Sequence, residues 1–259
     1  MIPAHAESRN PDPRLRRTKV AYVVTCEHGG NRIPAVYASL FRGKRRLLNS
    51  HRGYDPGALD VARALAQALG AVLIASTVSR LLVELNRSPG RQFRNSPVMR
   101  NASPDLREFV RRRYYEPYRR DVETLVAKAI AAGTRVVHIS SHSFTPSLDG
   151  NVRRADVGLL YDPARAGEHD LCVRWQRALE ARAPGWTVRR NYPYLGRSDG
   201  LTSHLRKRHA DAAYAGIEIE INQERVQNGA LPARDRRAIT WALLDALASQ
   251  RAMSRPDAR

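Results

Sequence analysis

The sequence has too few cysteines for a disulfide-stabilised protein, and it lacks the long apolar runs of a membrane-spanning one. Its two cysteines, Cys26 and Cys172, cannot build a disulfide framework and lack the spacing of a cysteine-based metal knuckle. No apolar run approaches the roughly 20 residues that cross a bilayer, and the N-terminus lacks the apolar centre of a secretory signal. We therefore expect a cytoplasmic protein with no membrane partner.

Lysine is also scarce, although the chain is strongly basic. Only four of the 44 basic residues are lysines, and the formal net charge is +19. The arginines are spread along the whole chain and do not gather with stacking aromatic side chains, which argues against a nucleic-acid partner. A coding bias explains the preference for arginine, and an anionic small substrate explains several of the arginines. A non-catalytic polyanion-binding protein remains as an alternative.

What the sequence does contain is a series of strand-length apolar runs separated by amphipathic helical patterns. The apolar runs are mostly continuous, as strands covered on both faces are, and they span residues 20–26, 71–77, 80–85, 135–141, 157–162 and 216–222. The helical patterns span residues 55–70, 103–133, 168–183 and 233–250. This alternation predicts an α/β fold with a mostly parallel sheet.

Three residues mark where the predicted helices begin, end or bend. Gly70 is placed as the C-cap of the first helix, and Ser103 as the N-cap of the second. Pro117 lies inside the second pattern and should kink or divide it, because proline cannot donate the helical hydrogen bond.

The chain shows no linker, no internal repeat and no low-complexity tract. At 259 residues it is long enough for one large α/β domain. We expect a single domain over residues 19–253, with flexible tails at 1–18 and 254–259.

Ionisable and polar side chains follow several of the predicted strands. Ligands of parallel sheets bind beyond the carboxyl ends of the strands, so these side chains are candidates for one common site. The candidates are Cys26-Glu27-His28, Asn86-Arg87, Ser141-His142-Ser143, and Glu220 with Asn222.

Each candidate also has a purely structural explanation. His138 is expected to be a hydrogen-bonded core residue, whereas His142, at the strand exit, is the better metal ligand. Cys26 is expected to be a small buried thiol and not a nucleophile. Asp55 opens a helix, so its carboxylate is an N-cap, a metal ligand, or both.

Two further groups favour function over structure. Arg80 and the Asn86-Arg87 pair flank an apolar run, where a guanidinium binds a carboxylate or stabilises an oxyanion. Glu218 and Glu220 share one face of an apolar strand, where an unpaired carboxylate is costly. We therefore expect Glu220, nearer the strand end, to be a general base.

Six motifs in this order resemble the N-formylglutamate amidohydrolase family, which is related to zinc carboxypeptidases, aspartoacylases and N-acetylmuramoyl-L-alanine amidases. The resemblance covers roughly residues 20–226. The motifs are "EHGGNRIP", "HRGYDPGALDVA", "VSRLLVELNRSP", "HSFTP", "NYPYLGRSDGLT" and "YAGIEIEINQ". The resemblance implies a three-layer α/β/α fold of the phosphorylase/hydrolase-like type and a zinc-dependent amidohydrolase.

The resemblance also implies roles for individual residues. His28 and His142 match the metal-binding histidines of the family, Asp55 lies where a carboxylate ligand is expected, and Glu220 matches the strand glutamate that serves as base. "VELNR" looks like the "VDLNR" of the carboxypeptidases, whose Asn-Arg pair holds the substrate carboxylate. That role would fall to Asn86 and Arg87.

Two further arginines receive roles in the expected reaction. Arg80 would assist in stabilising the oxyanion. Arg197, in the loop "YLGRSDG", would reach a second carboxylate of an acidic substrate.

One position departs from the carboxypeptidase pattern. Those enzymes place a carboxylate ligand three residues after the first histidine, and here that position is Asn31. The carboxylate must come from elsewhere, from Asp55 or else from Glu27. The expected substrate is a small anionic N-acyl amino acid such as N-formylglutamate, and a peptide or cell-wall fragment is the alternative.

Overall fold

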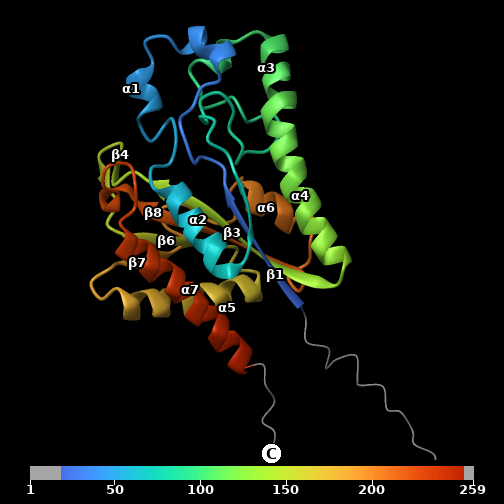
Figure 1. Cartoon of the computed structure of the whole chain (residues 1–259), viewed down its shortest axis with the longest axis vertical. Coiled ribbons are helices and arrows are strands. Elements are labelled where there is room, and N and C mark those ends of the chain that lie inside the picture. Colours follow the sequence, from blue (N-terminus) through green and yellow to red (C-terminus); the bar gives the residue numbers. More distant parts are fainter. Residues whose placement is uncertain (1–18, 254–259) are drawn as a thin grey trace, which may run out of the picture.

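Six strands form one mixed sheet in the computed structural model, which describes residues 19–253 (Figure 1). The strand order is β2-β1-β3-β8-β6-β7. Their bounds are β1 Lys19–Cys26, β2 Val72–Ala75, β3 Thr134–Phe144, β6 Val157–Leu160, β7 Val188–Arg190 and β8 Tyr214–Asn222. The first four strands of this order are parallel, and only the β6–β8 pair is antiparallel. The predicted mostly parallel sheet is confirmed.

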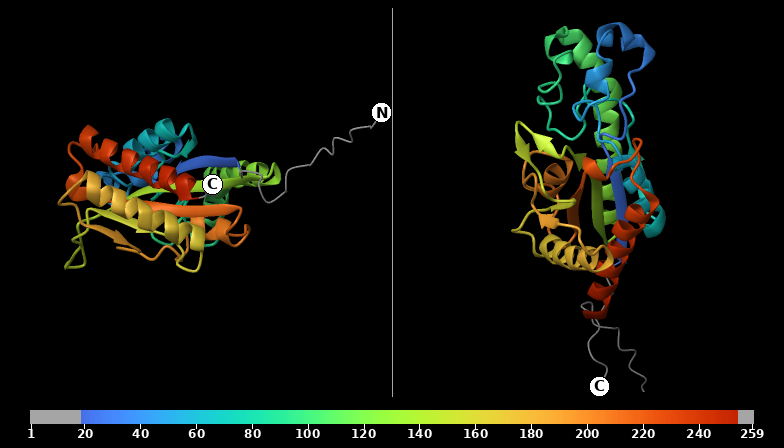
Figure 2. Two further views of the ribbon diagram at one scale, coloured as in Figure 1. Left: turned by 90° about the horizontal axis from the view of Figure 1, so that it is seen from below. Right: turned by 90° about the vertical axis from the view of Figure 1, so that its left-hand side faces the viewer.

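Helices cover both faces of the sheet. One face carries α2 (Ala58–Leu69), α5 (Ala166–Arg182) and α7 (Ala233–Met253), and the other carries α4 (Glu116–Ala131) and α6 (Leu201–Arg206). The short helices α1 (Arg45–Leu48) and α3 (Pro104–Val110) project beyond one end of the sheet, together with the 3₁₀ helix at Ala35–Phe41 (Figure 2). A small hairpin, β4 (Ser147–Leu148) with β5 (Asn151–Val152), follows β3.

Two separate apolar cores explain the three layers. Alternate residues of a strand point to opposite faces, so Val24 and Ile139 join the core beneath α2, α5 and α7, where Trp175 is fully buried. Val23 and Val136 join the second core, beneath α4 and α6. The expected α/β/α architecture is confirmed.

The helix boundaries follow the sequence closely. Gly70 ends α2 in the left-handed conformation, and the Ser103 hydroxyl accepts a hydrogen bond from the Leu106 N–H. The long pattern at 103–133 is divided by a π-helical turn at Arg111–Tyr115, directly before Pro117. Pro117 has no N–H to donate to the carbonyls of this turn, and single wider turns of this kind occur as insertions within α-helices.

The strand predicted at residues 80–85 is wrong. These residues form buried turns, in which the Leu82 N–H bonds back to the Ser79 carbonyl at 2.9 Å. The Glu84 N–H donates to the Gln92 carbonyl at 2.9 Å. A short continuous apolar run has no periodicity that separates a strand from a buried turn.

From the middle of each strand onward, the ionisable side chains of β3 and β8 lie on one face of the sheet only. Ile139 and Ile219 point to the apolar core, while His138, His142 and Glu220 lie on the α4 and α6 side. A folded sheet thereby directs ionisable groups from two neighbouring strands to a single face.

The tails predicted at residues 1–18 and 254–259 lie outside the described residues. Between residues 19 and 253, no helix combines the length and the apolar character that crossing a membrane requires.

Candidate metal centre and active site

The strands β1, β3 and β8 end at one large cavity. His28 lies two residues after β1, His142 lies near the end of β3, and Glu218 lies in β8. The loop before α2 supplies Asp55, and the buried turns after β2 supply Arg80, Asn86 and Arg87 to the cavity wall. The cavity has a volume of about 870 Å³.

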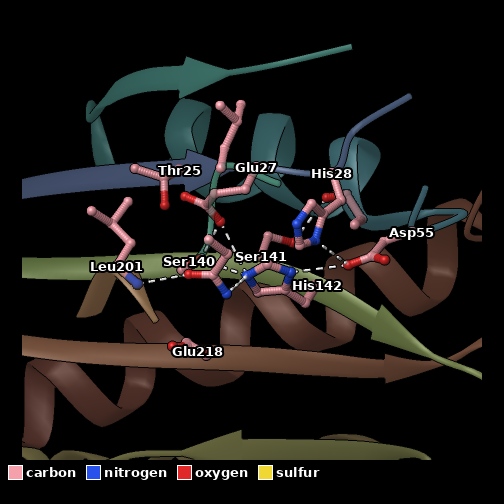
Figure 3. A network of polar contacts seen from close by, with 12 residues as sticks. Thr25, Glu27, His28, Asp55, Ser140, Ser141, His142, Leu201 and Glu218 are labelled. Carbon is pink, nitrogen blue, oxygen red and sulfur yellow. Dashed lines mark hydrogen bonds and ion pairs between the residues drawn. The ribbon is translucent and has the colours of Figure 1, made fainter. Parts of the chain in front are cut away.

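The three predicted metal ligands lie together. Asp55 Oδ2 lies 2.9 Å from His142 Nδ1 and 3.2 Å from His28 Nδ1 (Figure 3). One ligand atom from each of the three residues lies within 4.8 Å of the others. All three side chains are buried. Their donor atoms can therefore face one common ion.

A tight turn brings Asp55 to the histidines. The Asp55 N–H donates to the His28 carbonyl at 2.9 Å, and Gly57 then adopts a left-handed φ of 78°. The Asp55 side chain does not cap α2, because its oxygens contact His28, His142 and Arg80. Of the two roles considered for Asp55, helix cap and metal ligand, the structure supports that of a ligand grouped with the two histidines.

Each histidine contacts a second carboxylate through its other ring nitrogen, Nε2. His28 Nε2 contacts Glu84 Oε1, and His142 Nε2 lies 3.0 Å from Glu27 Oε2. Both Nδ1 atoms are thereby left facing Asp55. Carboxylates in this position fix the tautomer and orientation of metal-binding imidazoles. Glu27, the alternative ligand, lies on the far side of His142 from Asp55.

Glu27 is held in place by residues of β3 and α4. Its oxygens accept hydrogen bonds from the Ser140 hydroxyl at 2.7 Å and from the Tyr118 hydroxyl of α4 at 3.0 Å. Burial raises the pKa of Glu27, but the hydrogen bond and charge of His142 outweigh it and hold that pKa well below its usual value. Glu27 is therefore a buried anion.

Glu84 is a site residue that the sequence analysis missed. Its Oε2 accepts hydrogen bonds from Arg80 at 2.8 and 2.5 Å, and Arg80 also lies 3.2 Å from Asp55 Oδ1. The guanidinium of Arg80 thus joins two carboxylates and still reaches the cavity. An acidic residue inside the apolar run "LLVEL" is the sequence feature that could have identified it, because a buried carboxylate needs a partner.

Asn86 and Arg87 line the cavity as expected, and both are held by the segment before α6. The Asn86 side-chain oxygen accepts from the Leu201 N–H at 2.7 Å, and its Nδ2 lies 3.3 Å from His142 Nε2. Arg87 donates to the Asp199 carbonyl. Their side chains are therefore oriented by contacts within the protein.

Arg197 is not brought to the cavity. Its side chain is exposed, and it does not line the wall, although Leu195 and Ser198 on either side do. Position in a loop does not determine which way a side chain points. Arg52, Arg94 and Arg100, which were not singled out from the sequence, do line the cavity.

Glu220 lies beside His142, since the two residues are paired in register on β8 and β3. It is 5% exposed, and its Oε2 has no hydrogen-bond partner among the described residues. Burial raises the pKa of Glu220 to about 8, with the charges of Asp55 and Glu218 adding to the effect and those of His142 and Arg80 opposing it. Its neighbour Glu218 accepts a 2.5 Å hydrogen bond from Thr202.

Two residues expected to be structural are structural. His138 is fully buried, with its ring nitrogens 2.9 Å from the Thr25 hydroxyl and 2.7 Å from the Tyr214 hydroxyl. Cys26 is fully buried, and burial raises the pKa of its thiol.

The residues present fit a divalent metal. Two imidazole nitrogens and one carboxylate oxygen are the donor set of many hydrolytic zinc sites, in which a fourth position remains for water. The Oε2 of Glu220 is a buried atom without a hydrogen-bond partner among the described residues, but Glu220 does not line the cavity, whereas its neighbour Glu218 does.

Known proteins show the same sequence pattern and fold. The family model described as N-formylglutamate amidohydrolase matches residues 20–226. A gene product of Agrobacterium tumefaciens has 27% sequence identity and a TM-score of 0.74, over 92% of this chain and 93% of that one. The N-formylglutamate amidohydrolase of Ralstonia eutropha JMP134 has 20% identity and a TM-score of 0.65, over 90% and 95%. No curated protein matches this sequence.

The family match spans all three candidate ligands and both strands that carry the polar face. The resemblance inferred from the six sequence motifs is thereby confirmed. The chain belongs to the N-formylglutamate amidohydrolase family and is a hydrolase acting on amide bonds.

Proposed function

We propose that this protein hydrolyses the amide bond of an N-acyl amino acid such as N-formylglutamate, using zinc held by His28, Asp55 and His142. The observation that carries the proposal is the convergence of these three side chains, from separate segments, with their ligand atoms within 4.8 Å of one another. Zinc, when bound, supplies Lewis acidity that lowers the pKa of water and polarises a carbonyl oxygen.

Glu220 is the proposed general base. It takes a proton from the attacking water on its unpaired Oε2 and delivers it to the leaving nitrogen. The burial of this carboxyl, without a hydrogen bond to Oε2, supports the assignment.

Arg80, Asn86 and Arg87 are the proposed substrate-binding groups. Arg80 faces the cavity beside the metal ligands, where its N–H groups stabilise the oxyanion that develops during attack. Asn86 and Arg87 bind the α-carboxylate of the substrate, for which a guanidinium is well suited because it donates two parallel hydrogen bonds. Both residues line the same cavity wall.

Metal analysis and a substrate panel test this proposal together. Protein purified without added metal should contain about one equivalent of zinc per chain, and it should hydrolyse at least one of a panel of N-formyl and N-acetyl amino acids. Metal-free protein that binds nucleic acid with a steep salt dependence would instead identify a polyanion-binding protein.

A further inference from the structure

The cavity is much larger than the proposed N-formyl substrate. Its volume is about 870 Å³, toward the upper end of the roughly 300–1,000 Å³ typical of pockets for drug-sized ligands. N-formylglutamate has on the order of ten non-hydrogen atoms and is smaller than such ligands. The reaction proposed at the metal ligands therefore uses only one part of this space.

Three arginines on the cavity wall have no acidic partner. Arg52, Arg94 and Arg100 line the cavity and are exposed. Over the part of the chain that the structure describes, none of them forms an ion pair, whereas Arg80 is bound by Asp55 and Glu84. These three guanidinium groups are available to an anionic ligand.

The segment that carries Arg94 and Arg100 is anchored to the buried turn that contains Leu81. The Ser96 hydroxyl is buried and donates to the Leu81 carbonyl at 2.5 Å, and it accepts from the Met99 N–H at 3.0 Å. Met99 itself is fully buried. Arg94 and Arg100 thus extend into the cavity from a backbone fixed to the turns that also carry Arg80.

The remaining charges of the wall leave it positive. Outside the candidate active site, its acidic side chains are Asp149 and Asp199. Asp199 already accepts hydrogen bonds from Ser88 and lies 3.7 Å from Arg91. One carboxylate, that of Asp149, is left to oppose the three arginines.

The cavity also has an apolar wall. It is formed by Phe144, Leu148, Leu160, Tyr194 and Leu195. Tyr194 is 43% exposed and Leu195 is 52% exposed, so both offer apolar surface to a ligand. A ligand that fills the cavity therefore combines apolar segments with negative charge.

We propose that the substrate is an acidic, peptide-sized N-acyl compound with at least one carboxylate more than the two of N-formylglutamate. Arg94 and Arg100, with Arg52, bind the additional carboxylate, and the chain between the two anions packs against Tyr194 and Leu195. The inference rests on the proposed amidohydrolase function and specifies its substrate class.

Two matched pairs of compounds test the inference with the zinc-loaded protein. The first pair extends the acyl side: N-succinyl-glutamyl-alanine and its amide analogue succinamoyl-glutaminyl-alanine, which keeps only the α-carboxylate. The second pair extends the amine side: N-formyl-glutamyl-glutamate and N-formyl-glutaminyl-glutamine. Within each pair the size is the same and only the number of carboxylates differs.

In at least one pair, kcat/KM for the acidic compound should exceed that of the amide analogue by about tenfold or more, because hydrogen bonds to charged groups are strong. The double variant R94Q/R100Q should reduce this ratio to less than about twofold, and R52Q should reduce it in part. The control R45Q/R46Q removes the same charge from exposed positions outside the cavity wall and should keep the ratio.

Ratios near one in both pairs, or ratios unchanged in R94Q/R100Q, would overturn the inference. Calorimetric binding of the same four compounds separates it from the proposed function. Arginine-dependent binding of the acidic compounds without hydrolysis of any substrate would contradict the proposed function, and with it the assignment of these compounds as substrates. Hydrolysis of N-formylglutamate without any arginine-dependent preference would contradict the inference alone.

Discussion

The unpaired carboxyl oxygen of Glu220 gives the sharpest prediction at the residue scale. E220Q keeps the shape of the side chain but removes its ability to take a proton. Turnover should fall by roughly 10²–10⁴-fold, while zinc content stays unchanged, since Glu220 is not among the three grouped ligands. H28A and H142A should lose both zinc and turnover.

The neighbouring glutamate provides the matched control for E220Q. Glu218 lies on the same face of β8 but is engaged by the Thr202 hydroxyl. E218Q should therefore retain more activity than E220Q in steady-state assays. If E218Q lost turnover at full zinc occupancy and E220Q did not, the base would be Glu218.

The carboxylates behind the histidines should control metal affinity. E84Q and E27Q each remove a charged partner from the Nε2 atom of a candidate ligand. Loss of such a partner typically weakens metal binding by about 10–100-fold, which a chelator competition titration would measure. D121N, at an exposed site on α4, serves as the control. Equal zinc affinity in all three variants would contradict an orienting role.

At the scale of elements, the turn before α2 holds a metal ligand in place. Gly57 has a φ of 78°, and a Cβ added there would lie 2.9 Å from Val226 Cγ2. G57A should destabilise the fold by roughly 1–3 kcal/mol and should weaken zinc binding, because Asp55 is two residues away.

The substitution G70A separates the loss of stability from the loss of zinc affinity. Gly70 also has a left-handed φ, of 58°, but an added Cβ would have no neighbour within 4 Å. G70A should cost about 1 kcal/mol in unfolding free energy without changing zinc affinity. Denaturant unfolding and metal titration on both variants check this, and identical zinc affinities would show that the turn does not position Asp55.

The sequence predicts most elements here, because long periodic segments carry their own pattern. Helix α2 and its Gly70 cap, the Ser103 cap, and strands β1, β3 and β8 all follow from periodicity and cap residues. The three-residue β7 and the six-residue α6 are too short to show a period. The turns at 80–85 are as apolar as a strand, and only their hydrogen bonds distinguish them.

The two candidate histidines were accessible to the same reasoning because strand ends meet at one edge of a parallel sheet, whereas the ligand role of Asp55 followed from the family resemblance. The roles of Glu84 and Glu27 were accessible to neither, since they depend on the path of a turn and on which ring nitrogen each carboxylate meets. Arg197 illustrates the same limit: its loop borders the cavity, but its side chain is exposed outside it.

At the scale of the whole molecule, His138 should make the fold sensitive to acid. Burial lowers the pKa of this histidine from 6.5 to about 4. Between these values the unfolded chain binds a proton that the folded protein excludes, so stability falls as the pH falls. Between pH 7 and pH 5 the loss from this group should be about 2 kcal/mol.

The variant H138Q isolates this effect, because glutamine has no proton to gain in this range. Between pH 7 and pH 5 its unfolding free energy should fall by about 2 kcal/mol less than that of the wild type. The comparison uses the change with pH and not the absolute stability, which the substitution also alters. Parallel pH profiles for the two proteins would show that His138 is not the group responsible.

The π-helical turn at Arg111–Tyr115 ties the outer helical layer to the catalytic edge. Tyr115 donates a hydrogen bond to the Arg87 carbonyl, and Tyr118 donates one to Glu27. Removing one residue from this turn would rotate α4 by about 100° relative to α3. Val110 could then no longer pack in its core while both hydroxyls kept their hydrogen bonds, so one additional residue in this turn fixes how α4 is aligned with the candidate site.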